Sequence, residues 1–388
     1  VFGVGLPLCY LMNFNSSRYR LVGYGLFDAA TSCYVIAFST FVFPLFYKEL
    51  GSSESFKIGW GLLLTGAVVL SSLSLLLAGH LVTSKQRLAA LTGFALTGLS
   101  GAISIGFGRF ESKPLIAVFF LIMHASILAA SALYDSMLVE WRASGERTKV
   151  STWAWGIGYL AGALCLAAIL FGEGKGFSTR TLLSIGASGF GLILTISLFL
   201  LWRSILSPAE GCNMNGIVSL NEDSQKNRGP WLFLIGMWFI AEGIAAIQYF
   251  TALYAKSELA LNFQQIGRLF LLTQLLAAPL TILSGLLFAK MDRLKAVQAT
   301  LYVWIIICGM LYWGKGESFL YLLAFATATV IGTTPALLRA TQADYSRNET
   351  AALQFGVYSI IMRSGALFGP LLFSINAKSM GGRMAMAL

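Results

Sequence analysis

The sequence predicts an all-α protein that crosses a membrane many times, and three observations support this prediction. Hydrophobic residues make up 57% of the 388-residue chain and charged residues only 11%, whereas an ordinary soluble domain carries about 25% charged residues. Apolar segments of about twenty residues, the length that spans a hydrocarbon core, recur along the whole chain. Short polar loops separate these segments, and one long polar stretch lies near the middle of the chain.

The apolar segments before the central polar stretch predict the first six membrane helices. The run at residues 1–12 is too short to span a membrane and stays unassigned. The segments that follow it lie at residues 21–47, 58–78, 88–107, 114–134, 150–171 and 181–202.

The same pattern starts again after the central stretch. Because the chain begins at Val1 and ends where a new apolar segment begins, we expect both ends to be incomplete. The predicted division is an N-terminal half at residues 1–203, a cytoplasmic linker at 204–229 and a C-terminal half at 230–388. The second set of segments lies at residues 230–255, 265–288, 296–313, 319–338 and 353–375, with a twelfth starting near Arg383.

Landmarks shared by the two sets of segments indicate an internal duplication. Gly79 closes the second segment and Gly285 closes the eighth. The stretch ERTKVSTWAWGIGYLAGA at 146–163 aligns without gaps with ETAALQFGVYSIIMRSGA at 349–366. Both landmarks repeat at a spacing of roughly 200 residues, as a duplication requires. The excess of Lys and Arg in the even-numbered loops predicts a cytoplasmic N-terminus.

Composition and motifs exclude several classes of function. The net charge of +10 comes from basic residues in short loops, where membrane topology places them, and predicts no nucleic-acid partner. The five cysteines are scattered without metal-ligand spacing, and no HExxH motif or nucleotide-binding domain is present. We therefore predict no metal, no cofactor and no enzymatic activity, and name a small-molecule solute and the lipid bilayer as the partners.

Three charged residues near the middle of predicted helices are the candidate site: Asp28, Glu242 and Arg363. Charges at membrane depth are expensive and usually face a cavity or a partner. One interpretation is a site for substrate or for a coupling proton, in which Arg363 holds a carboxylate and an acid holds an amine or a proton. The other is a structural ion pair that joins two helices.

Polar and aromatic residues accompany these charges. Tyr24 and Ser32 share one helical face with Asp28, and Tyr358 lies in the same segment as Arg363. In the fifth segment Gly158 and Gly162 have the small-xxx-small spacing of close helix packing, and no strand precedes them as a dinucleotide fingerprint would require.

Together these residues resemble the major facilitator superfamily over essentially the whole chain. Within it, the likeness is to the "unknown major facilitator" permeases, relatives of the autophagy-linked vacuolar amino-acid effluxers. The stretches that support it are GLFDAATSCYVIAFSTFVFPLFYKEL, YDSMLVEW with ERTKVSTWAWGIGYLAG, AEGIAAIQYF and FGVYSIIMRSGALFGPLLF. The resemblance implies the major facilitator fold of two six-helix halves, with the twelfth helix truncated here.

The chain also departs from the superfamily's pattern. The loop between its second and third helices usually reads Gly-x-x-x-Asp-Arg-x-Gly-Arg-Arg, and that Asp contributes to closure on the cytoplasmic side. Here Thr83 replaces the Asp, and Ala289 replaces it in the second half. The usual latch between the halves is therefore in question.

The resemblance implies a secondary transporter of amino acids or related zwitterions that works by alternating access, with export as one direction. It places the protein in the cell membrane, with a vacuolar membrane as the alternative. The alternative function is a non-transporting membrane sensor or assembly partner with the same fold, and the missing Asp in both halves is its support.

Overall fold

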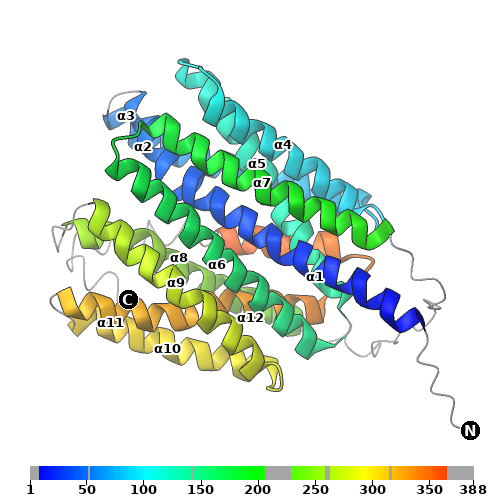
Figure 1. Cartoon of the computed structure of the whole chain (residues 1–388). Helices are drawn as coiled ribbons and strands as arrows, with labels where there is room; N and C mark the ends of the chain where they lie inside the picture. The colour runs from blue at the N-terminus through cyan, green and yellow to red at the C-terminus, as the bar shows by residue number, and fades with distance from the viewer. Residues whose placement is uncertain are drawn as a thin grey trace, which may run out of the picture.

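The computed structural model describes residues 8–50, 53–141, 143–206, 229–257, 263–313 and 317–364, and the regular structure in these ranges is helical. The helices lie roughly along a common direction as an elongated bundle (Figure 1). The predicted linker falls almost wholly outside the described residues. So do the second part of the eleventh segment and the predicted start of the twelfth helix near Arg383.

The helices before the linker follow the predicted segments in order. The first segment is divided between α1 and α2, and each of the other five is a single helix that is longer than its apolar run. Polar residues at the helix ends continue the helices beyond the apolar runs. The bounds are Leu8–Tyr34 for α1, Val42–Glu49 for α2, Ser53–Leu81 for α3, Arg87–Phe107 for α4, Lys113–Ser136 for α5, Ser144–Gly174 for α6 and Thr179–Leu206 for α7.

The helices after the linker repeat this succession. They are α8 at Gly229–Ser257, α9 at Phe263–Phe288, α10 at Arg293–Trp313, α11 at Glu317–Val330 and α12 at Thr333–Tyr345, followed by a helix over residues 351–364. Within the described ranges, 8 helices have the length and apolar character to cross a membrane. The prediction of an all-α, multi-pass membrane protein is confirmed.

Two predicted segment bounds are wrong. The first helix begins at Leu8, so the unassigned run at the start of the chain continues into it. The tenth segment does not end at Leu338, because after a turn at Ile331–Gly332 the chain continues as α12 to Tyr345. The polar residues of α12 made this part look like a loop, and two of them prove central below.

The first membrane segment contains a local irregularity. A π-helical turn at Val35–Thr40 separates α1 from α2. Pro44 lies in the first turn of α2 and has no N–H to donate to the carbonyl one turn back. A wider turn before it accommodates the proline within one membrane span, as such bulges commonly do.

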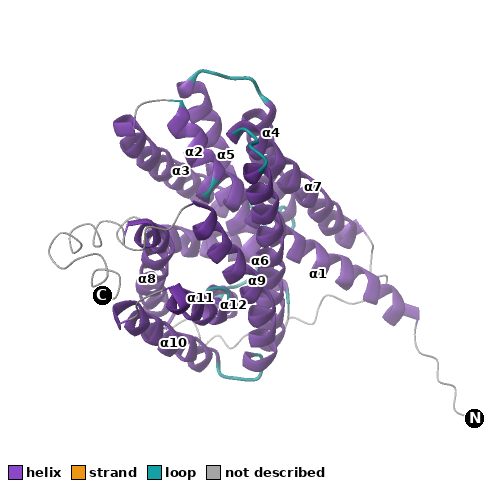
Figure 2. Ribbon diagram, turned by 60° about the vertical axis from the view of Figure 1, so that its left-hand side comes forward, coloured by secondary structure: helices purple, strands orange, loops and turns teal. Residues whose placement is uncertain are grey.

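The packing places α1 and α6 at the centre of the bundle. The helix α1 packs against α7 and α6, and α4 packs against α5 and α7. The helix α6 also packs along α9, which brings a helix from before the linker against one from after it (Figure 2). The small residues of α6 make these approaches close: a Cβ on Gly158 would stand 2.9 Å from Ser32 Oγ in α1. Gly162 likewise packs against Ser32 and against Gln274 of α9.

The two glycines that mark the predicted repeat both lie where helices from opposite sides of the linker meet. A Cβ on Gly79 would stand 2.8 Å from the Cα of Leu353, and a Cβ on Gly285 would overlap the side chain of Thr152. Thr152 is buried and donates a hydrogen bond to the carbonyl of Thr148, so it has little freedom to move. Glycine is therefore required at these contacts for steric reasons.

We expect Gly285→Ala to destabilise the purified protein by about 1–3 kcal/mol, because the added methyl group overpacks the α6–α9 contact. Gly236→Ala is the matched control, since that glycine has open space around it and the helix gains from alanine. Melting temperatures in detergent measure both variants. Equal melting temperatures for the two variants would contradict the steric requirement.

Candidate functional site

A buried arginine from α12 joins three helices in the interior of the bundle. The side chain of Arg339 is 3% exposed, and its Nη1 lies 3.1 Å from Asp28 Oδ2 of α1 and 3.0 Å from Asp135 Oδ1 of α5. Ionised carboxylates can only accept hydrogen bonds, and both of these accept from Arg339 Nη1. We call Arg339, Asp28, Asp135 and the Ser151 described next the Arg339 cluster.

Ser151 of α6 holds the rest of the guanidinium. Arg339 Nε donates to Ser151 Oγ at 2.9 Å, and Nη2 donates to the Ser151 carbonyl at 3.0 Å. Ser151 Oγ in turn donates to the carbonyl of Ala336 at 2.8 Å, one turn before Arg339. Every nitrogen of the guanidinium therefore has a partner, and its plane is fixed.

Aromatic rings enclose the cluster. The guanidinium carbon of Arg339 lies 5.6 Å from the ring centre of Tyr24, 5.5 Å from that of Tyr134 and 5.8 Å from that of Trp155. Tyr24 and Tyr134 stack at 4.1 Å, and the Tyr134 hydroxyl donates to the Tyr24 carbonyl. The ring faces add cation–π attraction and separate the charges from lipid.

The cluster contains two acids and one base. When both carboxylates are ionised it holds one excess negative charge, so it can accept a proton or a cation and still keep one carboxylate on Arg339. Removing the base would leave two unpaired acids inside the bundle, which is strongly unfavourable. The arrangement thus couples the contact between α12 and the helices α1 and α5 to the charge state of the acids.

The structure places the predicted site residues in different surroundings. Asp28 and Tyr24 belong to the Arg339 cluster, and Ser32 lies one turn further along α1 against Gly158. Tyr358 is buried and its ring lies 5.6 Å from that of Phe355.

The other two predicted charges are not joined to Asp28. Arg363 donates to the carbonyl of Leu128 at 2.9 Å and forms no ion pair within the described part of the chain. Glu242 of α8 is 8% exposed, and its Oε1 has no hydrogen-bond partner among the described residues. The structure therefore does not bring Arg363 together with Asp28 or Glu242, and the ion-pair partner of Asp28 is Arg339.

Sequence reasoning missed both Arg339 and Asp135. Each directly follows the predicted end of a segment, so each was assigned to a loop. The two residues are 204 positions apart, close to the repeat spacing of the glycine landmarks. The duplication itself was therefore the signal that could have found them.

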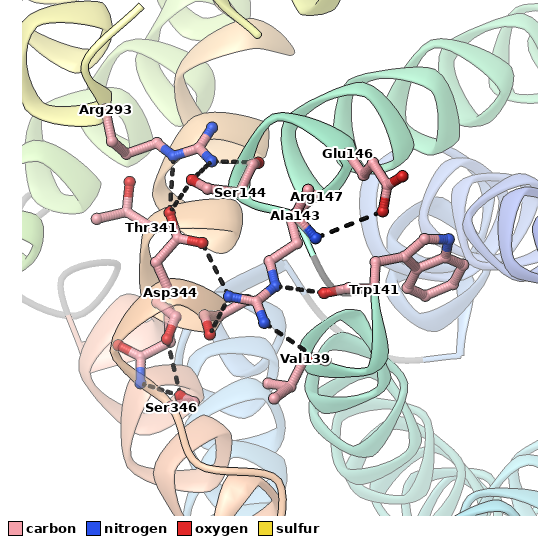
Figure 3. Close-up of polar contacts among 12 residues, drawn as sticks. Val139, Trp141, Ala143, Ser144, Glu146, Arg147, Arg293, Thr341, Asp344 and Ser346 are labelled. Carbon is pink, nitrogen blue, oxygen red and sulfur yellow. Dashed lines mark hydrogen bonds and ion pairs between the residues drawn. The ribbon is translucent and has the colours of Figure 1, made fainter. Parts of the chain in front are cut away.

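A second ionic network lies at the C-terminal end of α12 (Figure 3). Asp344 accepts hydrogen bonds from Arg147 of α6 at 3.0 Å, from Arg293 of α10 at 3.0 Å and from Ser144 at 2.7 Å. Arg147 also donates to the carbonyls of Trp141 and Val139. We call Asp344 with Arg147, Arg293 and Ser144 the Asp344 latch.

A matching network surrounds Arg87, the first residue of α4. Arg87 donates to the carbonyl and Oδ1 of Asn348 at 2.6 and 3.2 Å and pairs with Glu140 at 3.2 Å. Glu140 also pairs with Arg20. Arg87 opens α4 as Arg293 opens α10, and each arginine contacts an acid and a residue from the other side of the linker. The helix connections at this end thus join the two sides twice.

Thr83 and Ala289 replace the Asp that usually contributes to closure on the cytoplasmic side. The two networks show how the sides of the bundle are joined without it. The expected Asp is absent from both loops, yet arginines from the same loops contact residues on the other side of the linker. Arg87 donates to the carbonyl of Asn348, and Arg293 donates to the carbonyl of Ser144. The two sides are therefore joined at this end by the Asp344 latch, in which Arg147 and Ser144 donate to Asp344, and by the contact of Arg87 with Asn348. The missing Asp no longer supports a protein that has lost the ability to close.

Comparison with known families agrees with the arrangement of the helices. The model of the major facilitator superfamily matches residues 22–370. The chain belongs to the major facilitator superfamily. It is also 24% identical over 379 residues to the uncharacterized MFS-type transporter YxiO of Bacillus subtilis (strain 168), covering 92% of this chain and 88% of that protein.

Solved structures of this superfamily share the fold at low sequence identity. The human organic anion transporter MFSD10 has a TM-score of 0.71 at 12% identity, covering 97% of this chain and 96% of that chain. The proton:xylose symporter XylE bound to 6-bromo-6-deoxy-D-glucose has a TM-score of 0.67 at 14% identity, covering 97% and 93%. The transporter FucP in the outward conformation has a TM-score of 0.69 at 12% identity, covering 95% and 94%. The chain is thus a multi-pass integral membrane protein of a transporter superfamily.

We expect Arg339→Leu to destabilise the protein by about 3–5 kcal/mol, because it leaves Asp28 and Asp135 buried without a base. The triple variant D28N/D135N/R339L recovers most of this loss, since it buries no unpaired charge. Unfolding in detergent measures both. A single variant that unfolds like the wild type would contradict the role of the cluster.

We expect Asp344→Asn to open the latch, because Arg147 and Arg293 lose their shared acid. A reporter cysteine at Thr148, which is buried beneath the latch, then reacts several-fold faster with a thiol reagent in membranes. Asp292→Asn is the matched control, since among the described residues the Asp292 carboxylate accepts from the Lys295 backbone N–H and pairs with no arginine. Unchanged labelling in Asp344→Asn, or equal acceleration in the control, would contradict the latch.

Proposed function

We propose that the protein is a secondary active transporter that moves a small solute by alternating access. The moving bodies are the N-terminal half at residues 1–203 and the C-terminal half at 230–388, joined by the linker at 204–229. The observation that supports this most is the Arg339 cluster, in which α12 of one half pairs with Asp28 and Asp135 of the other. Transporters of this kind place their sites near the midplane between two repeats.

The two ends of the bundle support a cycle of opening and closing. The Asp344 latch and the Arg87 network join the halves at the linker end. The excess of basic residues in the even-numbered loops assigns this end to the cytoplasm. At the opposite end Gln264 of α9 donates to Glu173 of α6 at 2.8 Å. The α6–α9 contact therefore extends over the length of the bundle, and the halves rock about it.

The substrate that we propose is an amino acid or a related small zwitterion, and export is the proposed direction. The interior holds both carboxylates and guanidiniums, so a molecule with both charges finds partners of both signs. Related folds carry other solutes, such as the xylose of XylE and the organic anions of MFSD10. A transport assay must therefore include sugars and organic anions.

A proton is the coupling ion that we propose, because the two acids of the Arg339 cluster share one base. Protonation of Asp28 or Asp135 weakens its hold on Arg339 and so favours separation of α12 from α1 and α5. The proposed location is the cell membrane, since the relative YxiO is bacterial.

The test is transport by the full chain in liposomes, with an imposed pH gradient and a panel of labelled amino acids, dipeptides, sugars and organic anions. We expect accumulation of an amino acid that depends on the pH gradient. Asp28→Asn should lower the initial rate by about tenfold or more, because it removes half of the coupling pair. Glu111→Gln, at an exposed position outside the cluster, is the control and should transport like the wild type.

Two results would overturn the proposal. The first is a folded, reconstituted protein that transports no member of the panel. The second is Asp28→Asn with full gradient-driven transport, which would remove the cluster from the coupling mechanism.

A further inference from the structure

Two guanidiniums lie in the interior of the bundle, and they differ in the number of their hydrogen-bond and ion-pair partners. Arg339 has two carboxylates and a serine as partners. Arg363 donates one hydrogen bond, to the Leu128 carbonyl, and no carboxylate within the described residues pairs with it. Arginine carries five N–H donors. Because an unpaired cation at membrane depth is costly, Arg363 has both the charge and the free donors to receive an anion.

A histidine of α5 lies near the carbonyl that Arg363 contacts on that helix. His124 is one helical turn before Leu128, so its side chain shares the face that Arg363 contacts. The two side chains are within range of electrostatic interaction. His124 is 8% exposed and stacks on Phe120, with ring centres 5.2 Å apart.

One ring nitrogen of His124 takes part in a hydrogen bond. Its Nδ1 lies 2.5 Å from the hydroxyl of Tyr34, which is surrounded by the rings of Phe38 and Phe190. Which of the two atoms donates depends on the tautomer of His124. We take the tautomer in which Tyr34 donates to Nδ1. The neutral imidazole then carries its hydrogen on Nε2. That N–H has no acceptor among the described residues.

We propose that Arg363 and His124 form the subsite that binds the carboxylate of the transported solute. The proposal rests on the proposed transport function and assigns one part of its site. A guanidinium binds a carboxylate with two parallel hydrogen bonds, and the His124 Nε2–H supplies a third donor. Asp135 lies within electrostatic range of Arg363 but does not pair with it, so a solute carboxylate can take the hydrogen bonds that Arg363 still offers.

The Arg339 cluster is excluded as this subsite by its own charges. It already holds two acids against one base, and a third carboxylate there would be repelled by Asp28 and Asp135. Asp135 lies two turns from Leu128 on the same face of α5. A zwitterion with its carboxylate at Arg363 therefore finds the excess negative charge of the cluster further along that face, where its ammonium group is favoured.

The experiment is a thermal-shift titration of the detergent-purified full chain, which measures binding without transport. The probes are sodium acetate, sodium propionate, glycine and alanine, each compared with its amide: acetamide, propionamide, glycinamide and alaninamide. Sodium chloride at equal concentration corrects for general salt effects. We expect saturable stabilisation by the acids, because a ligand that binds the folded state raises its melting temperature. The amides should give no saturable shift.

Variants connect the binding to the two residues. Arg363→Gln should weaken binding of the acids about tenfold or more, and Arg363→Lys should weaken it less, because it keeps the charge but loses the planar fork. His124→Leu should weaken binding, and His124→Gln should restore part of it through its amide N–H. Arg268→Gln is the matched control, since it removes an exposed cation at the start of α9, and its affinity should equal the wild type.

Equal stabilisation by acids and amides would overturn the proposal, as would unchanged affinity in Arg363→Gln. If Arg363→Gln does not fold, the Lys variant and the two His124 variants decide the outcome in the same way. Binding of acids through Arg363 without transport in liposomes would reject the transport function and keep the subsite. Transport that does not require a carboxylate on the solute would reject the subsite and keep the transport function.

Discussion

The structure depends on one constraint, which is that three charges are kept together inside a membrane bundle. Arg339, Asp28 and Asp135 come from α12, α1 and α5, and none of them is stable there without the others. The helices must therefore meet at this level. The enclosing rings of Tyr24, Tyr134 and Trp155 follow from the same requirement, because they separate the charges from lipid while leaving the guanidinium attracted to their faces. A contact of this kind is rigid while all three charges are present and weakens when an acid is neutralised.

In the proposed transport mechanism the two interior arginines have different tasks. Arg339 is saturated by groups of the protein, so changes in its contacts alter how the helices meet. Arg363 is held by one backbone carbonyl, so it can engage a solute without first breaking an ion pair. A single arginine could not do both, because a solute carboxylate would compete with the acids that hold the helices. The two arginines contact α5 at separate residues, Asp135 and Leu128. In the proposed mechanism, substrate binding and helix closure can therefore influence each other through charge.

The sequence predicts the helices well and the site only in part. Both outcomes follow from the use of hydropathy as the main signal. Hydropathy reports contact with lipid, so long apolar runs identify helices such as α4 and α10 almost to the residue. It also reveals Asp28, a single acid inside an apolar run. The helix α12 faces other helices and has a polar sequence, so hydropathy predicts a loop at Arg339 and Asp344. Which base meets Asp28 depends on the packing of helices distant in the chain, and apolar periodicity carries no information about that choice.

Under the predicted duplication, the centre and the linker end of the bundle differ in the charges of the matched positions. At the linker end the two copies do the same thing, since Arg87 with Glu140 and Arg293 with Asp344 are equivalent pairs. At the centre Asp135 and Arg339 have the same separation in sequence as Glu140 and Asp344, but their charges are opposite. Positions related by a pseudo-two-fold axis can meet near that axis, where two identical charges would repel. An arginine at one of the two positions gives instead an ion pair between helices on opposite sides of the linker.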